Sequence, residues 1–169
     1  MERTFKIIYT SDTHGHIFPV NYAAGCGESS GLLNLAAQID KNGNTLVLDG
    51  GDSLQGTPLV QYYLAHADEF PHHPVAEAFN AMGCDYFTLG NHDFNFGTDY
   101  LGSYLGNLNA RCVCENVSAK NGCAPLYPAC VHTLENGLRV GIVGIVTDYV
   151  NIWERPEHIA SIRITDPIP

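Results

Sequence analysis

Short apolar runs typical of β-strands alternate with segments of helical apolar spacing, and each of the first three strand-like runs ends in a polar cluster. The pattern predicts strands over residues 4–10, 45–48, 85–89 and 111–115, the first of them buried. It predicts helices over residues 31–40, 58–65, 74–82 and 98–108. Strands that alternate with helices favour a layered α/β domain, and open sheets of this kind place their ligands at the carboxyl ends of the strands. The three polar clusters are therefore the candidate functional site.

The last third of the chain has a different pattern. Residues 130–134 and 138–146 are strand-like, and Asn136-Gly137 between them predicts a β-hairpin. Residues 151–169 are expected to be mostly loop, with one more strand over 161–164. No internal repeat or linker divides the sequence, so we expect residues 1–169 to form one domain.

The charge balance is acidic, with 18 Asp and Glu against 8 Lys and Arg and a net charge of −10. Such a surface repels polyanions, so we expect no binding to a nucleic acid polymer. A phosphate-handling protein of this charge needs a local attraction for its anionic substrate, and bound divalent cations supply one.

The first strand-like run follows the N-terminal residues directly and is far too short to span a bilayer. We therefore expect no targeting segment, no membrane contact and a cytoplasmic protein. If a signal peptide has been removed, a secreted or periplasmic location is expected instead.

The six cysteines lack the paired spacing of a structural zinc site. Cys112 and Cys114 alternate in a predicted strand, which places both thiols on one face. We interpret the cysteines as small buried hydrophobic residues, with disulfides as the alternative.

The first polar cluster contains Asp12-x-His14. In extended backbone, residues two apart point to the same side, so this carboxylate and imidazole can share one metal ion. An oxygen and nitrogen ligand pair suits Mn, Fe, Co, Ni or Zn better than Ca or Mg. The pair occurs often by chance and is a weak signal alone.

The second cluster, Gly50-Gly51-Asp52, allows a tight turn and presents a carboxylate at the end of a strand. That carboxylate can bridge two cations, or it can cap the following turn. In the third cluster, Asn91 offers a neutral oxygen ligand and His92 can hold or protonate a substrate oxygen. The alternative is a left-handed turn at Asn91 and a solvated His92.

Taken together and in this order, Asp12-x-His14, Gly51-Asp52 and Gly90-Asn91-His92-Asp93 resemble the first three motifs of the calcineurin-like metallophosphoesterases. Residues 51–58, 90–97 and 141–144 resemble more narrowly the branch that contains 5′-nucleotidases and 2′,3′-cyclic-nucleotide phosphodiesterases/3′-nucleotidases. The resemblance covers essentially the whole chain. It implies a layered α/β fold, a β-sandwich flanked by helices.

The resemblance also implies a set of roles. Asp12 and His14 would bind a first divalent cation, Asp52 would bridge it to a second, and Asn91 would bind the second. The two ions, of Mn, Zn, Fe, Co or a similar metal, would clamp a phosphoryl group and activate the attacking water. His92, with Asn91, would act on the scissile bond of a nucleotide or another small phosphoester.

Two departures from the family are visible. Many 5′-nucleotidases have Asp three residues after the motif His, whereas this chain has Asn95, a feature that favours the cyclic phosphodiesterase side. Relatives also complete the metal pair with later histidines in a Gly-His-x-His motif. After His92 this chain has only His132 and His158, neither in such a motif. We therefore expect the N-terminal portion of a catalytic domain, without the nucleotide-binding domain, that binds metal weakly and has little activity.

The same residues fit several alternative functions. A non-catalytic metal-binding or interaction module derived from the family is the main alternative, because the late histidines are missing. Protein phosphatase and sulfur-ester hydrolase activities are weaker alternatives within the superfamily. A dinucleotide site at Gly141-Ile142-Val143-Gly144 is rejected, since the full glycine pattern is absent. The oligomeric state is not predicted.

Overall fold

A computed structural model describes residues 2–168 of the chain. Its main feature is a parallel sheet of four strands in the order β1-β4-β5-β6. The register pairs Thr10 with Asp49, Asp49 with Phe87, and Phe87 with Cys112, so neighbouring strands end side by side. These strands are β1 (Lys6–Thr10), β4 (Thr45–Asp49), β5 (Tyr86–Phe87) and β6 (Arg111–Cys112).

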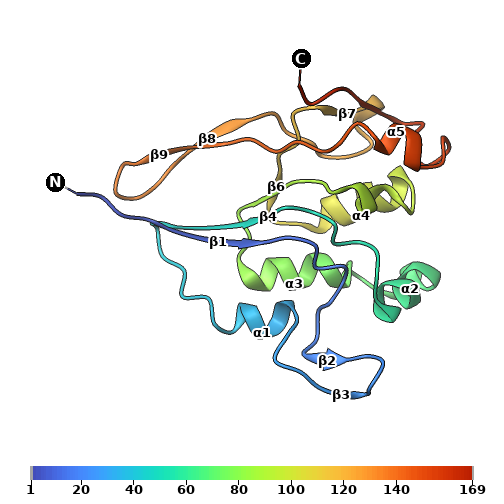
Figure 1. Cartoon of the computed structure of the whole chain (residues 1–169), viewed down its shortest axis with the longest axis horizontal. Coiled ribbons are helices and arrows are strands. Elements are labelled where there is room, and N and C mark those ends of the chain that lie inside the picture. Colours follow the sequence, from blue (N-terminus) through green and yellow to red (C-terminus); the bar gives the residue numbers. More distant parts are fainter. Residues whose placement is uncertain (1, 169) are drawn as a thin grey trace.

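Helices follow the strands in the predicted alternation, and α1 and α3 lie on one side of the sheet (Figure 1). The helices are α1 (Leu32–Ala36), α2 (Pro58–Ala65), α3 (Pro74–Met82) and α4 (Thr98–Asn107). Proline begins both α2 and α3, where its missing N–H costs no helical hydrogen bond. Left-handed Gly83 ends α3. None of the described helices has the length and hydropathy needed to cross a bilayer.

Helix α1 is shorter than predicted, five residues in place of the expected 31–40. After Ala36, the N–H groups of Gln38 and Ile39 donate to carbonyls three residues back, not four. This tighter turn ends the α-helix, although the apolar spacing that predicted it continues.

The predicted hairpin lies on the other side of the sheet from α1 and α3 (Figure 1). It consists of β8 (Cys130–Thr133) and β9 (Arg139–Ile142), and Gly137 in its turn has a φ of 81°. The sequence did not predict β7 (Val117–Ala119), which pairs with the predicted last strand β10 (Ile162–Ile164). The other unpredicted elements are β2 (Val20–Asn21), β3 (Cys26–Gly27), α5 (Val150–Trp153) and the 3-10 helices η1 (Ala67–Glu69), η2 (Asn91–Phe94) and η3 (Lys120–Gly122).

The hydrophobic core lies where α3 and α4 face the sheet. Its largest fully buried side chains include Phe79, Phe87 and Tyr104, whose rings meet edge to face. Cys112 and Cys114 are 2% exposed and all six cysteines are free thiols, so the interpretation of these two as buried hydrophobic residues is confirmed. Cys26 departs from it, because it is exposed.

The prediction that the first strand is buried is wrong. Strand β1 lies at the edge of the sheet and pairs only with β4. Ile7 is 49% and Tyr9 63% exposed, because no described residue covers that part of the sheet face. An apolar run thus identified the strand correctly but not its position in the sheet.

Asn116 ties the C-terminal part of the chain to the sheet. Its Nδ2 donates to the carbonyls of Val146 and Thr165, both at 2.8 Å, and its Oδ1 accepts from the N–H of Val146 at 3.0 Å. Asn116 and Val146 are both buried, so the two backbone groups of Val146 have no water to replace the Asn116 side chain.

We expect Asn116→Ala to lower the free energy of unfolding by about 3 kcal/mol, because it leaves buried backbone groups without a partner. Urea denaturation followed by circular dichroism measures the change. The control is Asn109→Ala, since Asn109 is exposed. Equal midpoints for the two variants would contradict the assignment.

Candidate metal centre

The loops that follow β1 and β4 are joined by backbone hydrogen bonds that continue the sheet. Asp12 N–H donates to the Gly51 carbonyl at 2.9 Å and His14 N–H to the Asp52 carbonyl at 2.9 Å. Because β1 and β4 are parallel neighbours, their carboxyl ends meet at the same edge. The two loops are therefore held against each other before any ligand is considered.

Asp12, His14 and Asp52 converge in this region. One ligand atom from each can be chosen so that all three lie within 4.8 Å of one another. Two carboxylates and an imidazole form a donor set that suits a divalent transition metal. The sequence predicted these three residues as ligands, and the structure brings them together.

The three residues converge through a different backbone conformation from the predicted one. Asp12, His14 and Asp52 have φ angles of 55°, 47° and 59°, in the left-handed region and not in extended backbone. Only Asn121, among the other described non-glycine residues, shares a positive φ. Such backbone is rare outside glycine and costs about 1–3 kcal/mol per residue, so its concentration here is itself a sign of a functional site.

His14 is oriented by the loop after β4. Its Nδ1 lies 2.7 Å from the carbonyl oxygen of Gln55, which can only accept, so Nδ1 carries the proton. The neutral ring therefore presents unprotonated Nε2, the form that binds a metal. Gly56 makes this approach possible, because a Cβ there would lie 2.7 Å from the Cβ of His14.

Asp52 is held by the third loop. Its Oδ1 accepts the N–H of His92 at 2.7 Å. Any Cβ on Gly90 would collide with the Asp52 carboxylate, and one on Gly51 would collide with the backbone of Leu89 and Gly90. The glycines thus serve close contact between loops as well as the tight turn that the sequence predicted.

Asp93 joins the second and third loops from inside the protein. Its Oδ1 accepts from the N–H groups of Ser53 (2.8 Å) and Leu54 (3.1 Å), and its Oδ2 accepts from those of Asp52 and Gly90, both at 2.9 Å. Burial raises the pKa of Asp93 to about 6 despite these bonds, because the side chain is fully enclosed. The sequence analysis did not predict this role of Asp93.

Asn91 and His92 begin η2 directly after Gly90. The rings of His92 and His14 lie edge to face with centroids 5.4 Å apart, so His92 borders the three-residue cluster. On its other side, His92 lines a pocket of about 250 Å³ together with Asn91, Asn95, Val150, Trp153 and Glu154. Both predicted catalytic residues therefore line this pocket, and His92 also borders the cluster.

The later histidines lie elsewhere. His132 in β8 bonds the hydroxyl of Tyr86 at 3.0 Å, as a strand residue outside the cluster. His158 bonds Glu154 at 2.9 Å. Each of these two histidines thus has a hydrogen-bond partner outside the cluster.

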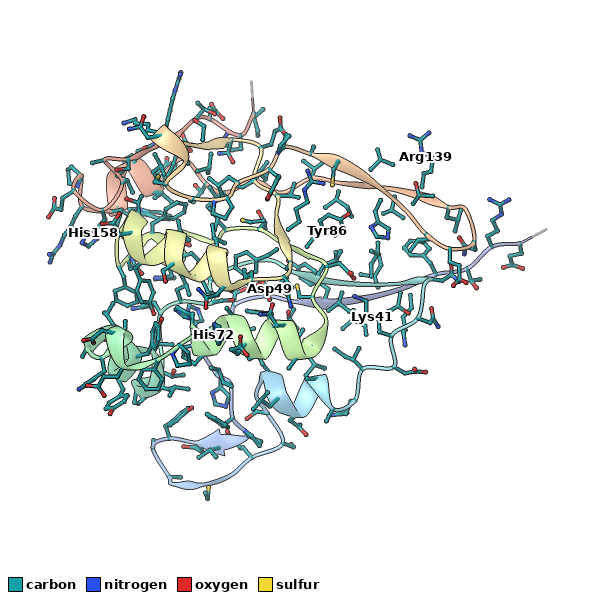
Figure 2. All side chains as sticks on the ribbon, turned by 180° about the vertical axis from the view of Figure 1, so that it is seen from behind. Lys41, Asp49, His72, Tyr86, Arg139 and His158 are labelled. Carbon is teal, nitrogen blue, oxygen red and sulfur yellow. The ribbon has the colours of Figure 1, made fainter. Side chains whose placement is uncertain are left out.

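Asp49 is a further buried carboxylate beneath the loops (labelled in Figure 2). It accepts from Thr10 Oγ1 and from the N–H of Gly51 at 2.9 Å. Burial raises the pKa of Asp49 to about 7, and the nearby Asp93 contributes in the same direction. The region around these loops thus contains more acidic groups than the predicted site included.

No ion pair among the described residues neutralises this acidic region. The ion pairs found are Lys41–Asp85 and His158–Glu154. In Figure 2, Lys41 and His158 lie on opposite sides of Asp49. A concentration of carboxylates without Lys or Arg is favourable for a divalent cation, and the residues present fit one.

We expect Asp93→Asn to lower the free energy of unfolding by about 3 kcal/mol. The amide would turn an NH2 group toward two backbone N–H donors that now have an acceptor. Urea denaturation of the metal-free protein measures the loss. The matched control is Asp99→Asn at an exposed position, and a similar loss in both would contradict the role of Asp93.

The raised pKa of Asp49 predicts a pH dependence of stability. A carboxyl whose pKa rises on folding, here from 3.8 to about 7, stabilises the folded state below pH 4 and loses that effect as the pH rises to 7. We expect the metal-free protein to lose up to about 4 kcal/mol across this range through Asp49. Asp49→Asn should flatten the dependence, whereas Asp68→Asn should leave it unchanged. Unfolding midpoints measured in EDTA from pH 4 to pH 7.5 test this.

Comparison with known proteins agrees with the fold and the motifs. The trifunctional nucleotide phosphoesterase protein YfkN of Bacillus subtilis is 30% identical over 95% of this chain and 12% of that protein. The 2′,3′-cyclic-nucleotide 2′-phosphodiesterase/3′-nucleotidase of Salmonella typhimurium is 27% identical over 95% of this chain and 27% of that protein. A crystal structure of a putative 5′-nucleotidase from Staphylococcus aureus superposes with a TM-score of 0.77 at 32% identity, over 94% of this chain and 32% of that one.

The chain thus spans about a third or less of the length of these relatives. The layered α/β fold of the calcineurin-like enzymes is confirmed by the structural match. The family described as calcineurin-like phosphoesterase matches residues 5–161, which is most of the sequence. The chain therefore belongs to the calcineurin-like phosphoesterase family.

Proposed function

We propose that this chain forms the metal-binding part of the active site of a nucleotide phosphoester hydrolase. The observation that carries the proposal is the convergence of Asp12, His14 and Asp52 in left-handed backbone at the carboxyl ends of two adjacent parallel strands. Strained backbone is retained where the surrounding structure enforces it, and three ligand-type residues share it here.

In this proposal, Asp12, His14 and Asp52 would hold a first divalent cation, and Asp52 and Asn91 would offer oxygen ligands to a second. The Asp52 Oδ1 already accepts the His92 N–H, which fixes the carboxylate while leaving Oδ2 for a ligand. Divalent cations bound there supply Lewis acidity to the phosphoryl group and to the attacking water. Divalent cations of the Mn, Zn, Fe or Co type fit the donor set.

His92 acts on the leaving oxygen of the substrate. Its Nδ1 is engaged by Asn95 at 2.9 Å, so Nε2 is the nitrogen left for the substrate. His92 also borders the ring of His14, which supports a role for it at a phosphoryl group held by the cluster. There it stabilises the developing charge or donates a proton.

The substrate class follows from the relatives and from local chemistry. The named activities of two relatives are those of a trifunctional nucleotide phosphoesterase and a 2′,3′-cyclic-nucleotide phosphodiesterase/3′-nucleotidase. Asn95, in place of Asp, favours the cyclic phosphodiesterase side. The exposed aromatic Trp153 in the pocket beside His92 offers a surface for a base.

Among the described residues only His14 supplies an imidazole to the cluster, because His132 and His158 are bonded elsewhere. We therefore propose that the chain by itself retains one cation and turns over slowly. The second candidate function, a non-catalytic metal-binding module, is favoured by the same observation.

After loading with Mn²⁺ and dialysis, we expect the wild-type chain to retain metal and Asp52→Asn to lose it, because the variant removes a charged ligand from the cluster. Elemental analysis measures bound Mn²⁺ per chain. The control is Asp68→Asn, at an exposed position in η1. It removes one negative charge, as Asp52→Asn does, and should retain metal. Equal retention by all three proteins would contradict the assignment of Asp52.

The loaded proteins are then assayed on 2′,3′-cyclic AMP and on AMP. Slow hydrolysis by wild type that is lost in Asp52→Asn supports the hydrolase, and faster turnover of the cyclic substrate supports the cyclic phosphodiesterase side. Metal retention without hydrolysis of either substrate favours the non-catalytic module.

A further inference from the structure

Asn95 lies between His92 and a carboxylate from a distant part of the chain. Its Oδ1 is 2.9 Å from His92 Nδ1, and its Nδ2 donates to Glu154 Oε2 at 2.6 Å. Glu154 follows α5 and is 59 residues away in sequence. An ionised carboxylate only accepts hydrogen bonds, so it must face the amide nitrogen of Asn95.

Glu154 is itself held firmly. Its Oε1 accepts the N–H of Arg155 at 2.8 Å and lies 2.9 Å from His158 Nδ1, and its side chain is 8% exposed. Burial alone would raise the pKa of Glu154, but the bonds from Arg155, Asn95 and His158 outweigh burial and lower it. The group is therefore an acceptor with a fixed position.

The orientation of Asn95 determines the proton position on His92. With its nitrogen facing Glu154, Asn95 presents Oδ1 to the imidazole, and that oxygen only accepts. His92 Nδ1 must therefore carry a proton. In the neutral ring Nε2 is then unprotonated, whereas a reversed Asn95 would require the opposite tautomer.

We propose that Glu154 is a positioning residue that acts through Asn95 to hold His92 in the Nδ1–H tautomer with Nε2 free. The importance of Nε2 rests on the proposed function, which places it at the substrate. The hydrogen bonds that link Glu154, Asn95 and His92 do not depend on that function. In a direct histidine–carboxylate pair the carboxylate bonds the imidazole itself. Here Glu154 bonds Asn95, and Asn95 bonds the imidazole.

The test is the tautomer of His92, read by long-range ¹H–¹⁵N correlation spectra of the imidazole nitrogens in metal-free protein in alkaline buffer, where the ring is neutral. The His92 signals are assigned by their loss in His92→Gln. We expect wild type to show Nδ1 as a protonated and Nε2 as an unprotonated nitrogen. A wild-type ring protonated on Nε2 would overturn the proposal.

Glu154→Gln keeps the shape of the side chain but allows an amide to meet Asn95 in either orientation. We expect both His92 nitrogens to shift toward averaged values as the second tautomer becomes populated. Glu157→Gln, an exposed neighbour, is the control and should match wild type. If Glu154→Gln also matches wild type, Glu154 does not set the tautomer.

A second substitution tests whether the effect passes through residue 95. Asn95→Asp in the Glu154→Gln background gives His92 a carboxylate that can only accept, so the Nδ1–H form should return. Failure to restore it would show that Glu154 does not act through this position. Because the readout requires neither cation nor turnover, a protein without hydrolytic activity would count against the proposed function alone.

Discussion

Four backbone N–H groups from two loops donate to the carboxylate of Asp93, which no solvent reaches. A buried charge is tolerated only when its hydrogen bonds are satisfied, so the loops must keep their shape for Asp93 to remain there. Because the backbone N–H groups of Asp52 and Gly90 both donate to Asp93 Oδ2, these two residues cannot move independently. The position of the Asp52 side chain, and through its Oδ1 that of the His92 backbone, depends on this one internal contact. The position of Asp52 in the candidate site is thus fixed from inside the protein.

The parts of the fold that were predicted correctly are those with local causes. Helix α3 begins at Pro74 and ends before Gly83, and both residues act through their own backbone conformation. The hairpin of β8 and β9 likewise follows from its Asn136-Gly137 turn. The exposure of β1 and the pairing of β7 with β10 depend on what lies across the sheet or far along the chain. No window of sequence contains that information.

The same distinction holds for the site. Asp12, His14, Asp52, Asn91 and His92 were found because each follows a strand within a recognisable cluster, although their assigned ligand and catalytic roles remain predictions. The left-handed backbone of the cluster was not predicted, since φ is imposed by the contacts between loops. Glu154 was missed because its partner Asn95 is 59 residues away, and nothing in the composition of either segment links them.

At Asp12, His14 and Asp52, the residue type that the left-handed backbone favours differs from the type that can bind a cation. At each of these positions glycine would relieve the backbone strain, yet glycine offers no side-chain ligand to a cation. Glycine at all three would therefore remove the cluster of side chains while it eased the backbone. Non-glycine residues occupy all three positions. Their positive φ angles therefore indicate a requirement other than the stability of the fold.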